Sequence, residues 1–284
     1  MRCYVRKELI LQQLLKIQQL KSEISKRIWK HSQPVCEIDK DKFNGKGEAL
    51  TKDVIKARVE RLAEQLIKEH PNSNPVLISL MDGALPFANL LQHALNERGY
   101  QYTYTTMQAS SYGNHTVSGE LKIGSMPKVH LGGRTVFVVD DVCETGKTYL
   151  KIRELFNNMG AKQVSLVVLV DKVQQRTANY SPEYVGFEIP SDAFIVGMGL
   201  DYYGELRNEL EIRGVDPAFS ANEEEQKLLE SEEALNKELV QIIAAEKLPK
   251  LSGSDHTFIG NMTTKDSSHL ITEHKPVAEM FSLN

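Results

Sequence analysis

The sequence predicts an α/β fold in which a mostly parallel, twisted sheet is flanked by helices. Three apolar runs bounded by turn-forming residues have the length and composition of buried parallel strands: 76–80 (VLISL), 136–139 (VFVV) and 163–171 (QVSLVVLVD). Amphipathic patterns between these runs are typical of helices, and the alternation has the spacing of strand–helix–strand crossovers. We therefore expect parallel strands with helices on both faces.

Composition and charge agree with an ordinary globular protein. The 284 residues are 41% hydrophobic and 25% charged, and they allow one large domain or two small ones. A net charge of −4 argues against general nucleic-acid binding. The cysteines Cys3, Cys36 and Cys143 form neither a disulfide framework nor a CxxC pair, which favours a reducing compartment. Because no apolar run approaches the ~18 residues of a membrane span and no signal peptide is recognisable, we expect a cytoplasmic protein.

The first 50 residues predict a helix followed by a linker. Residues 1–30 contain eight Lys or Arg and two Glu, and their apolar residues fall on one helical face. Such a basic amphipathic helix could lie on a membrane or a nucleic acid, on its own domain, or on a partner subunit. Residues 31–50 are polar and contain glycine, so we expect a loop or linker.

The next elements begin a domain that we expect to span residues 51–215. Thr51 or Asp53 caps a helix that stops before Pro71, and the strand 76–80 leads into a helix of roughly 85–97 that ends before Gly99. Residues 100–107 alternate as a strand does. Residues 108–133 are polar and rich in Gly and Ser, which is typical of a functional lid or binding loop.

The remaining elements complete the domain and add a C-terminal extension. A helix over 147–159 ends at Gly160, and short strands around 184–189 and 194–201 continue the sheet or form its edge. Within 216–284, the stretch 221–240 holds seven Glu and two Lys, and apolar residues at helical spacing predict a helix to about 243. Past Pro249 the periodicity disappears, so this tail is a candidate for disorder.

The segment 136–148 (VFVVDDVCETGKT) predicts a binding site. Asp140 and Asp141 follow a predicted strand, at the strand end where α/β sheets bind ligands. The following TGKT (145–148) begins a helix, whose N-terminal N–H groups and hydroxyls favour a phosphate. A Walker A loop is excluded because the position five before Gly146 is Asp141 rather than glycine. A sugar phosphate as ligand explains both the aspartates and the TGKT turn. The carboxylates would accept hydrogen bonds from the sugar hydroxyls, while the turn would hold the phosphate.

This pattern resembles the 5-phosphoribosyl-1-diphosphate signature of type I phosphoribosyltransferases. Other segments resemble the hypoxanthine-guanine members of that family in the same order: 81–91 (MDGALPFANLL), 109–123 (ASSYGNHTVSGELKI), 169–172 (LVDK), 179–190 (NYSPEYVGFEIP) and 194–208 (FIVGMGLDYYGELRN). The resemblance covers roughly residues 52–213. It implies a type I phosphoribosyltransferase-like core with a small hood, to which residues 1–50 and 216–284 add helical extensions.

The resemblance also implies residue roles at the sugar and the diphosphate. Asp140 and Asp141 would hold the ribose hydroxyls, and Asp141 would reach Mg²⁺ through water. Asp201 would help to bind Mg²⁺, and Arg207 the diphosphate. The 5′-phosphate would be bound by Thr145, Gly146, Lys147 and Thr148.

Further residues match the base site and the loops that surround it. Lys172 would donate to the exocyclic oxygen of a 6-oxopurine, Phe194 would stack on the purine, and Ile195 would read the base edge through its backbone. Two more pairs match loops of the family: Ser111 and Tyr112 the mobile loop that closes over the reacting centre, and Asp82 and Gly83 the diphosphate loop, where the family often has Lys-Gly or Arg-Gly.

One position departs from the family in the residue expected to move a proton. The acid three positions after Asp141, usually aspartate in the family, exchanges a proton with a purine ring nitrogen, and here it is Glu144. The longer side chain keeps the carboxylate chemistry and extends its reach by one methylene group.

Taken together, the resemblance implies Mg²⁺-dependent transfer of a phosphoribosyl group from 5-phosphoribosyl-1-diphosphate to hypoxanthine, guanine or xanthine. It also implies a homodimer or homotetramer. Two alternatives stay open. The chain could be a sensor that binds the activated sugar without catalysis, or an interaction protein whose functional element is the Glu-rich helix of 221–243.

Overall fold

A six-stranded sheet lies at the centre of the protein. The computed structural model describes residues 2–38, 46–71, 73–111, 121–189 and 194–247. The strand order is β6-β5-β4-β7-β8-β9. All neighbouring strands run parallel except β6, which is antiparallel to β5. The mostly parallel sheet is therefore confirmed, with strands β4 (Val76–Met81), β5 (Thr103–Ser111), β6 (Leu121–Ser125), β7 (Thr135–Cys143), β8 (Gln163–Asp171) and β9 (Tyr184–Glu188).

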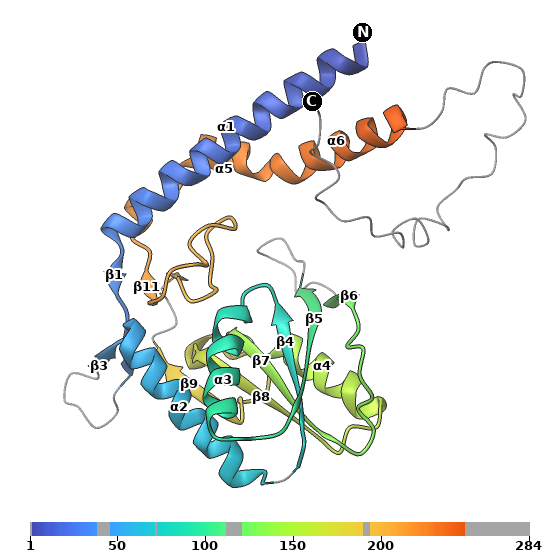
Figure 1. The fold of residues 1–284 in the computed structure, drawn as a ribbon. Helices are drawn as coiled ribbons and strands as arrows, with labels where there is room; N and C mark the ends of the chain where they lie inside the picture. Colours follow the sequence, from blue (N-terminus) through green and yellow to red (C-terminus); the bar gives the residue numbers. More distant parts are fainter. Residues whose placement is uncertain (1, 39–45, 72, 112–120, 190–193, 248–284) are drawn as a thin grey trace, which may run out of the picture.

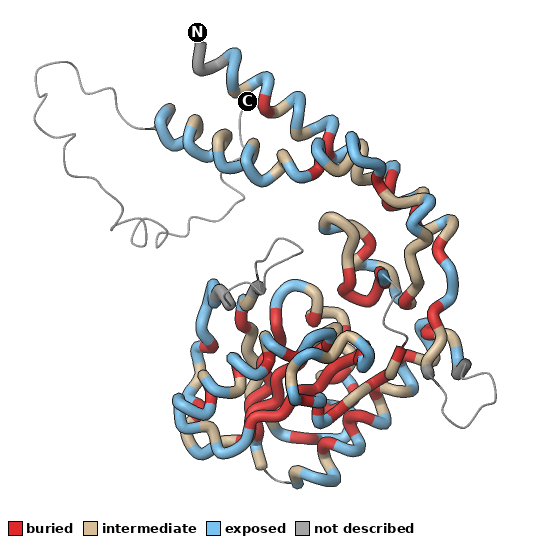
Figure 2. Tube along the Cα trace, turned by 180° about the vertical axis from the view of Figure 1, so that it is seen from behind, coloured by how far each residue is buried: buried red, intermediate tan, exposed pale blue. Residues whose placement is uncertain are grey.

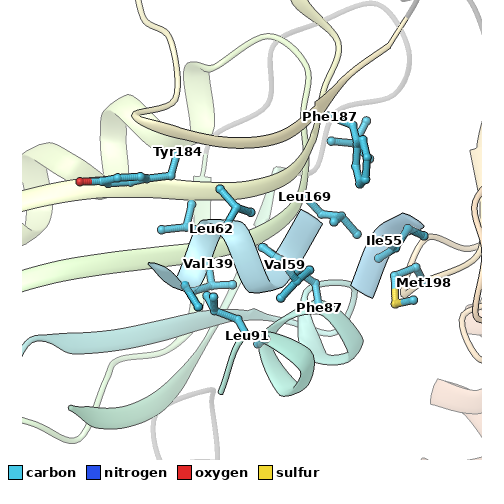
Figure 3. Packing of buried hydrophobic residues seen from close by; sticks show 14 of the residues in the cluster. Ile55, Val59, Leu62, Phe87, Leu91, Val139, Leu169, Tyr184, Phe187 and Met198 are labelled. Atoms are coloured by element: carbon cyan, nitrogen blue, oxygen red, sulfur yellow. The ribbon is translucent and has the colours of Figure 1, made fainter. Parts of the chain in front are cut away.

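Helices cover both faces of this sheet, as the alternation of elements predicts (Figure 1). Because neighbouring residues of a strand point to opposite faces, Phe137 and Val139 lie in one core and Val136 and Val138 in another. Helices α2 (Lys52–Glu69) and α3 (Leu85–Glu97) pack on the first core, which Figure 3 shows, and α4 (Lys147–Asn158) packs on the second. Figure 2 shows the central strands as the most continuously buried part of the chain.

The helices of the core begin and end close to their predicted bounds. Thr51 is the N-cap of α2, and its Oγ1 accepts from the N–H of Val54 at 3.4 Å. Helix α3 spans the predicted 85–97, and α4 starts directly after Gly146. Strand β7 runs to Cys143, four residues beyond its predicted end, because residues up to Cys143 continue to pair with β8.

A second, smaller sheet forms above the strand ends and corrects two predictions. Its order is β1-β11-β10, with β1 (Gln33–Pro34), β10 (Ile195–Val196) and β11 (Arg213–Gly214). Residues 194–201 therefore do not continue the main sheet. The predicted linker over 31–50 is also wrong in part, because it contributes β1 and the antiparallel pair β2 (Cys36–Ile38) and β3 (Lys46–Ala49). Strands this short depend on distant partners, so local sequence gives little signal for them.

The region predicted as one long loop, 108–133, contains regular structure. Strand β5 extends to Ser111, and β6 returns beside it with the register Gln108↔Ser125 and Ala109↔Ile123. Residues 112–120 lie outside the described part of the chain. The sequence does not indicate this pair of strands, because an edge strand is only half buried and can have a polar composition.

The two extensions pack on each other. The N-terminal helix α1 (Arg2–His31) lies beside α6 (Glu232–Lys247) in both views, and it also contacts α5 (Glu223–Glu230) (Figures 1 and 2). Its buried residues Ile17, Ile24 and Ile28 share one cluster with apolar residues of α5 and of the segment 194–215, which we call the hood. The predicted Glu-rich helix is thus two helices, and the apolar face of α1 is buried by its own chain.

Opposite charges also join the extensions. Arg6 contacts Glu238 at 2.7 Å, Lys21 contacts Glu232 at 2.6 Å and Arg27 contacts Glu225 at 3.1 Å. The basic character of α1 is therefore matched by the acidic helices of the C-terminal extension. None of the helices in the described part of the chain combines the length and apolarity needed to cross a bilayer.

Candidate active site

A cavity of about 300 Å³ opens where the order of the strands reverses. The chain passes from β4 to β5 on one side, and returns to β7, β8 and β9 on the other. In open α/β sheets a crevice at the carboxyl ends of such strands binds the ligand. Seven of the predicted site residues line this cavity: Gly83, Asp140, Asp141, Glu144, Thr145, Gly146 and Thr148.

The two aspartates lie next to each other at the end of β7, and both are half-buried. Oδ1 of Asp140 accepts from the N–H of Asp141 at 3.0 Å, and Oδ1 of Asp141 accepts from the N–H of Val142 at 2.9 Å. Burial and the neighbouring carboxylate raise the pKa of Asp140 well above its usual value. Burial also raises the pKa of Asp141, while hydrogen bonds and the charge of Arg207 oppose the shift. The raised pKa values favour the protonated form of each carboxyl group, and in the ionised form the carboxylate oxygens can accept from hydroxyl groups.

The turn after β7 has the geometry of an anion site. Gly146 has φ +77°, a left-handed conformation that favours glycine, and α4 begins at the next residue. Thr145 Oγ1 accepts from the N–H of Lys147 at 3.4 Å. The side chain of Lys147 is exposed and does not line the cavity, whereas Thr145 and Thr148 do. The N–H groups of the first turn of α4 have no acceptor within the helix, and they lie beside hydroxyl groups, an arrangement that favours phosphate binding.

Lys172, the first residue after β8, does not line the cavity but contacts Glu144, which does. Its Nζ donates to Oε1 of Glu144 at 2.8 Å, and its side chain is only 6% exposed. The carboxylate of Glu144 is 44% exposed. The structure thus joins two residues that lie 28 positions apart in the sequence and that the prediction assigned to the same purine.

The hood adds a charged pair beside the aspartates. Arg207 contacts Asp201 at 2.8 Å and donates to the carbonyl oxygen of Gly199 at 2.6 Å. A Cβ atom at Gly199 would overlap the carbonyl oxygen of Gly83, and one at Gly83 would overlap the carboxylate of Asp141. Glycine at both positions therefore lets the hood approach the strand ends closely.

Two of the predicted base-binding residues, Phe194 and Ile195, lie outside the cavity, in the hood. Phe194 is 52% exposed, and its ring meets Tyr202 edge-on with the centroids 5.8 Å apart. Ile195 is buried in β10, where its backbone pairs with Gly214. An exposed ring beside a strand backbone can stack on a planar group and read its edge.

Three of the predicted loop residues remain without a described role. Asp82 is exposed and follows a cis peptide bond with Met81. Ser111 is the last residue of β5, and Tyr112 lies outside the described residues.

The cavity also contains residues that the prediction missed, among them Cys143 and Tyr149. Both are buried, and Cys143 lies between Asp141 and Glu144, so the alternation of the strand could have indicated it. In the described residues, no three His, Cys, Asp or Glu side chains form a metal cluster.

Comparisons with known proteins agree with this geometry. Residues 46–203 match the phosphoribosyl transferase domain. The chain is 37% identical over 171 residues to a hypoxanthine-guanine phosphoribosyltransferase of Bacillus subtilis, which covers 60% of this chain and 92% of the relative. A structure of a hypoxanthine phosphoribosyltransferase from Staphylococcus aureus is similar with a TM-score of 0.57 and 30% identity, over 61% of this chain and 92% of that one.

A third comparison concerns a carboxylate substitution in a related protein. It is a solved structure described as the glutamic acid mutant in an analysis of an invariant aspartic acid in HPRTs, with a TM-score of 0.55 and 28% identity. It covers 59% of this chain and 94% of the other. The fold, the strand-end cavity and these matches lead to one conclusion: the chain belongs to the type I phosphoribosyltransferase family, among relatives of the hypoxanthine-guanine type.

Proposed function

We propose that this protein transfers a 5-phosphoribosyl group from 5-phosphoribosyl-1-diphosphate to a 6-oxopurine, giving the nucleoside monophosphate and diphosphate. The observation that supports it best is the single cavity that holds both aspartates and the Thr145–Thr148 turn. One ligand in this cavity could therefore contact the carboxylates through its sugar hydroxyls and the anion site through its 5′-phosphate. Family membership supplies the reaction class.

In this proposal the sugar is held at three points. Asp140 and Asp141 accept hydrogen bonds from the ribose hydroxyls, and the turn with Thr145, Gly146, Lys147 and Thr148 binds the 5′-phosphate. Arg207 and the N–H groups of the Asp82–Gly83 loop bind the diphosphate, where negative charge builds as the glycosidic bond breaks.

The purine lies between Phe194, which stacks on it, and the Glu144–Lys172 pair. Lys172 donates to the exocyclic oxygen, and Ile195 contacts the base edge through its backbone. Glu144 is the general base that accepts the proton of the attacking ring nitrogen. The distance of 2.8 Å between Glu144 and Lys172 supports these roles, since it places the ammonium group beside a carboxylate that lines the cavity. Closure of the loop with Ser111 and Tyr112 excludes water from the activated sugar.

A Mg²⁺ ion fits the donor set of this site. Proteins hold Mg²⁺ through one or two carboxylates together with substrate phosphates, and half-buried Asp201 and Asp141 both approach Arg207, the proposed diphosphate ligand. Asp201, and Asp141 through water, would hold the ion, which supplies positive charge for the leaving diphosphate.

The proposal includes the organisation of the chain. Residues 51–215 form the transferase domain in the cytoplasm, and residues 1–50 and 216–284 are its extensions. Assembly into a homodimer or homotetramer is the expected state.

Two acidic residues of the site are compatible with a second candidate function. Asp82 is an exposed acid in the proposed diphosphate loop, and Glu144 stands where the family usually has aspartate. A protein that binds the activated sugar as a sensor, without catalysis, would tolerate both.

An assay with a panel of bases separates the two functions. The full chain is mixed with 5-phosphoribosyl-1-diphosphate, Mg²⁺ and hypoxanthine, guanine or xanthine, and the nucleoside monophosphate is measured beside the thermal stabilisation by the sugar. The transferase forms product with at least one base. Stabilisation without product from any base would favour the sensor.

A further inference from the structure

The N-terminal helix reaches the hood from outside the matched domain. Residues 46–203 match the phosphoribosyl transferase domain, and α1 ends at His31. Ile24 and Ile28 of α1 are each 1% exposed and share a cluster with Val196 and Leu206 of the hood. Val196 follows Ile195, and Leu206 precedes Arg207, so α1 supports the segment that holds both proposed ligand contacts.

Arg27 of α1 fastens the chain that follows the hood. Its Nε donates to the carbonyl oxygen of Phe219 at 3.0 Å, and its Nη2 donates to the carbonyl oxygen of Ser220 at 3.3 Å and to Glu225 at 3.1 Å. The ring of His31, one turn later on the same helix, stacks on Phe219 at 3.8 Å. The backbone at 219–220 is therefore fixed by α1.

Ala221, the residue after this segment, contacts the hood. The N–H of Ala221 donates to the hydroxyl of Tyr202 at 2.9 Å. Ala221 is 4% exposed, and a buried N–H group needs such an acceptor. The ring of Tyr202 in turn meets Phe194 edge-on. A continuous set of contacts thus runs from Arg27 through residues 219–221 and Tyr202 to Phe194.

The hood segment itself needs outside support. Met198, Tyr203 and Leu206 all have positive φ values, of 50°, 50° and 70°. L-residues adopt this conformation only when their surroundings enforce it. Leu206 is buried against α1, so the helix is one of the elements that hold the segment in place.

We propose that α1 is a positioning element of the base site. It acts through Arg27 and the 219–221 segment to fix Tyr202, which orients the ring of Phe194. This inference rests on the proposed function, in which Phe194 stacks on the purine. Tyr202 is then a positioning residue, since it acts on the base through Phe194.

The first test compares two neighbouring tyrosines. Tyr202→Phe keeps the ring and removes the acceptor of the Ala221 N–H, and it should raise the Kd of guanosine monophosphate about fivefold. Tyr203→Phe is the matched control, because it removes the hydroxyl of the neighbouring ring and keeps the Ala221–Tyr202 hydrogen bond, and it should bind as the unmodified chain does. In turnover, the KM for the purine rises in Tyr202→Phe, while kcat and the KM for the activated sugar do not change.

The second test asks whether the effect originates in α1. Arg27→Ala should weaken nucleotide binding as Tyr202→Phe does, and Lys16→Ala, at an exposed position of α1, should not. Because both changes interrupt one set of contacts, the Arg27→Ala/Tyr202→Phe double variant should bind no more weakly than either single variant.

Calorimetric titration of the full-length variants with guanosine monophosphate decides the matter. Equal Kd values for Tyr202→Phe and Tyr203→Phe, or additive effects of Arg27→Ala and Tyr202→Phe, would overturn the positioning role while leaving the proposed function intact. An unmodified chain that binds no purine nucleotide would instead overturn the proposed function, and the inference with it.

Discussion

The ammonium group of Lys172 donates to the carboxylate of Glu144 at 2.8 Å, which joins the ends of two neighbouring strands, β8 and β7. The buried cation needs a counter-charge, and Glu144 provides it from the rim of the cavity. In the proposed reaction the same two groups contact the purine, one at its exocyclic oxygen and one at the proton to be removed. The pair therefore links base recognition to proton transfer.

Replacing Lys172 should weaken recognition of the base selectively. Lys172→Gln removes a charged donor, so the KM for a 6-oxopurine should rise about tenfold, while the KM for 5-phosphoribosyl-1-diphosphate stays unchanged. Steady-state kinetics with each substrate varied in turn measures both constants. Lys151→Gln on the exposed side of α4 is the control. An equal rise in both KM values would show that Lys172 supports the site as a whole.

The ionised carboxylate of Asp140 should lower the stability of the folded protein at neutral pH. Its folded-state pKa lies above the unfolded value because of burial and the neighbouring Asp141. Its ionisation therefore destabilises the fold as the pH rises from the unfolded pKa through the folded pKa. Asp140→Asn keeps the shape, so in metal-free protein it should raise Tm by a few degrees near pH 7, and by less toward pH 4.

The same variant should lose sugar binding, because an amide is a weaker acceptor for ribose hydroxyls than a carboxylate. Thermal unfolding at both pH values measures the stability, and Glu154→Gln, at an exposed acid of α4 outside the site, serves as the control. A Tm for Asp140→Asn that is lower than that of the unmodified protein at neutral pH would show that the ionised Asp140 does not destabilise the fold.

The contacts of α1 predict that this helix belongs to the folded unit. Ile28→Ala creates a cavity among residues of α1, the hood and α5, so it should lower the free energy of unfolding by about 2–5 kcal/mol. Leu15→Ala removes an apolar side chain of the same helix that is 57% exposed, and should change it by less than about 0.5 kcal/mol. Urea denaturation compares the two variants. Similar values for both would indicate that α1 does not pack on the hood in solution.

The sequence allowed the central sheet and the strand-end site to be predicted because both are local. Apolar runs such as 76–80 and 163–171 define strands without reference to distant residues, and segment 136–148 contains its carboxylates and its anion site together. The short strands β1 and β10 could not be located in this way, since each has two residues and pairs with the distant β11.

The contacts between side chains of the site and of the extensions could not be predicted from the sequence either. Glu144 and Lys172 meet only because β7 and β8 are neighbours, and Arg27 reaches residues 219–220 only because the two extensions fold together. Both depend on contacts across long sequence separations, for which a single sequence has no signal. The expected role of Glu144 could be stated from the sequence, whereas its partner could not.

In the proposed transferase reaction Glu144 accepts a proton from the purine, and the variant Glu144→Gln tests this role. The amide cannot accept the proton, so kcat should fall by about 100-fold or more, while the Kd of 5-phosphoribosyl-1-diphosphate stays unchanged. Glu154→Gln, on the exposed face of α4, should keep full turnover. Turnover of Glu144→Gln equal to that of the unmodified chain, at saturating sugar and base, would remove Glu144 from the mechanism.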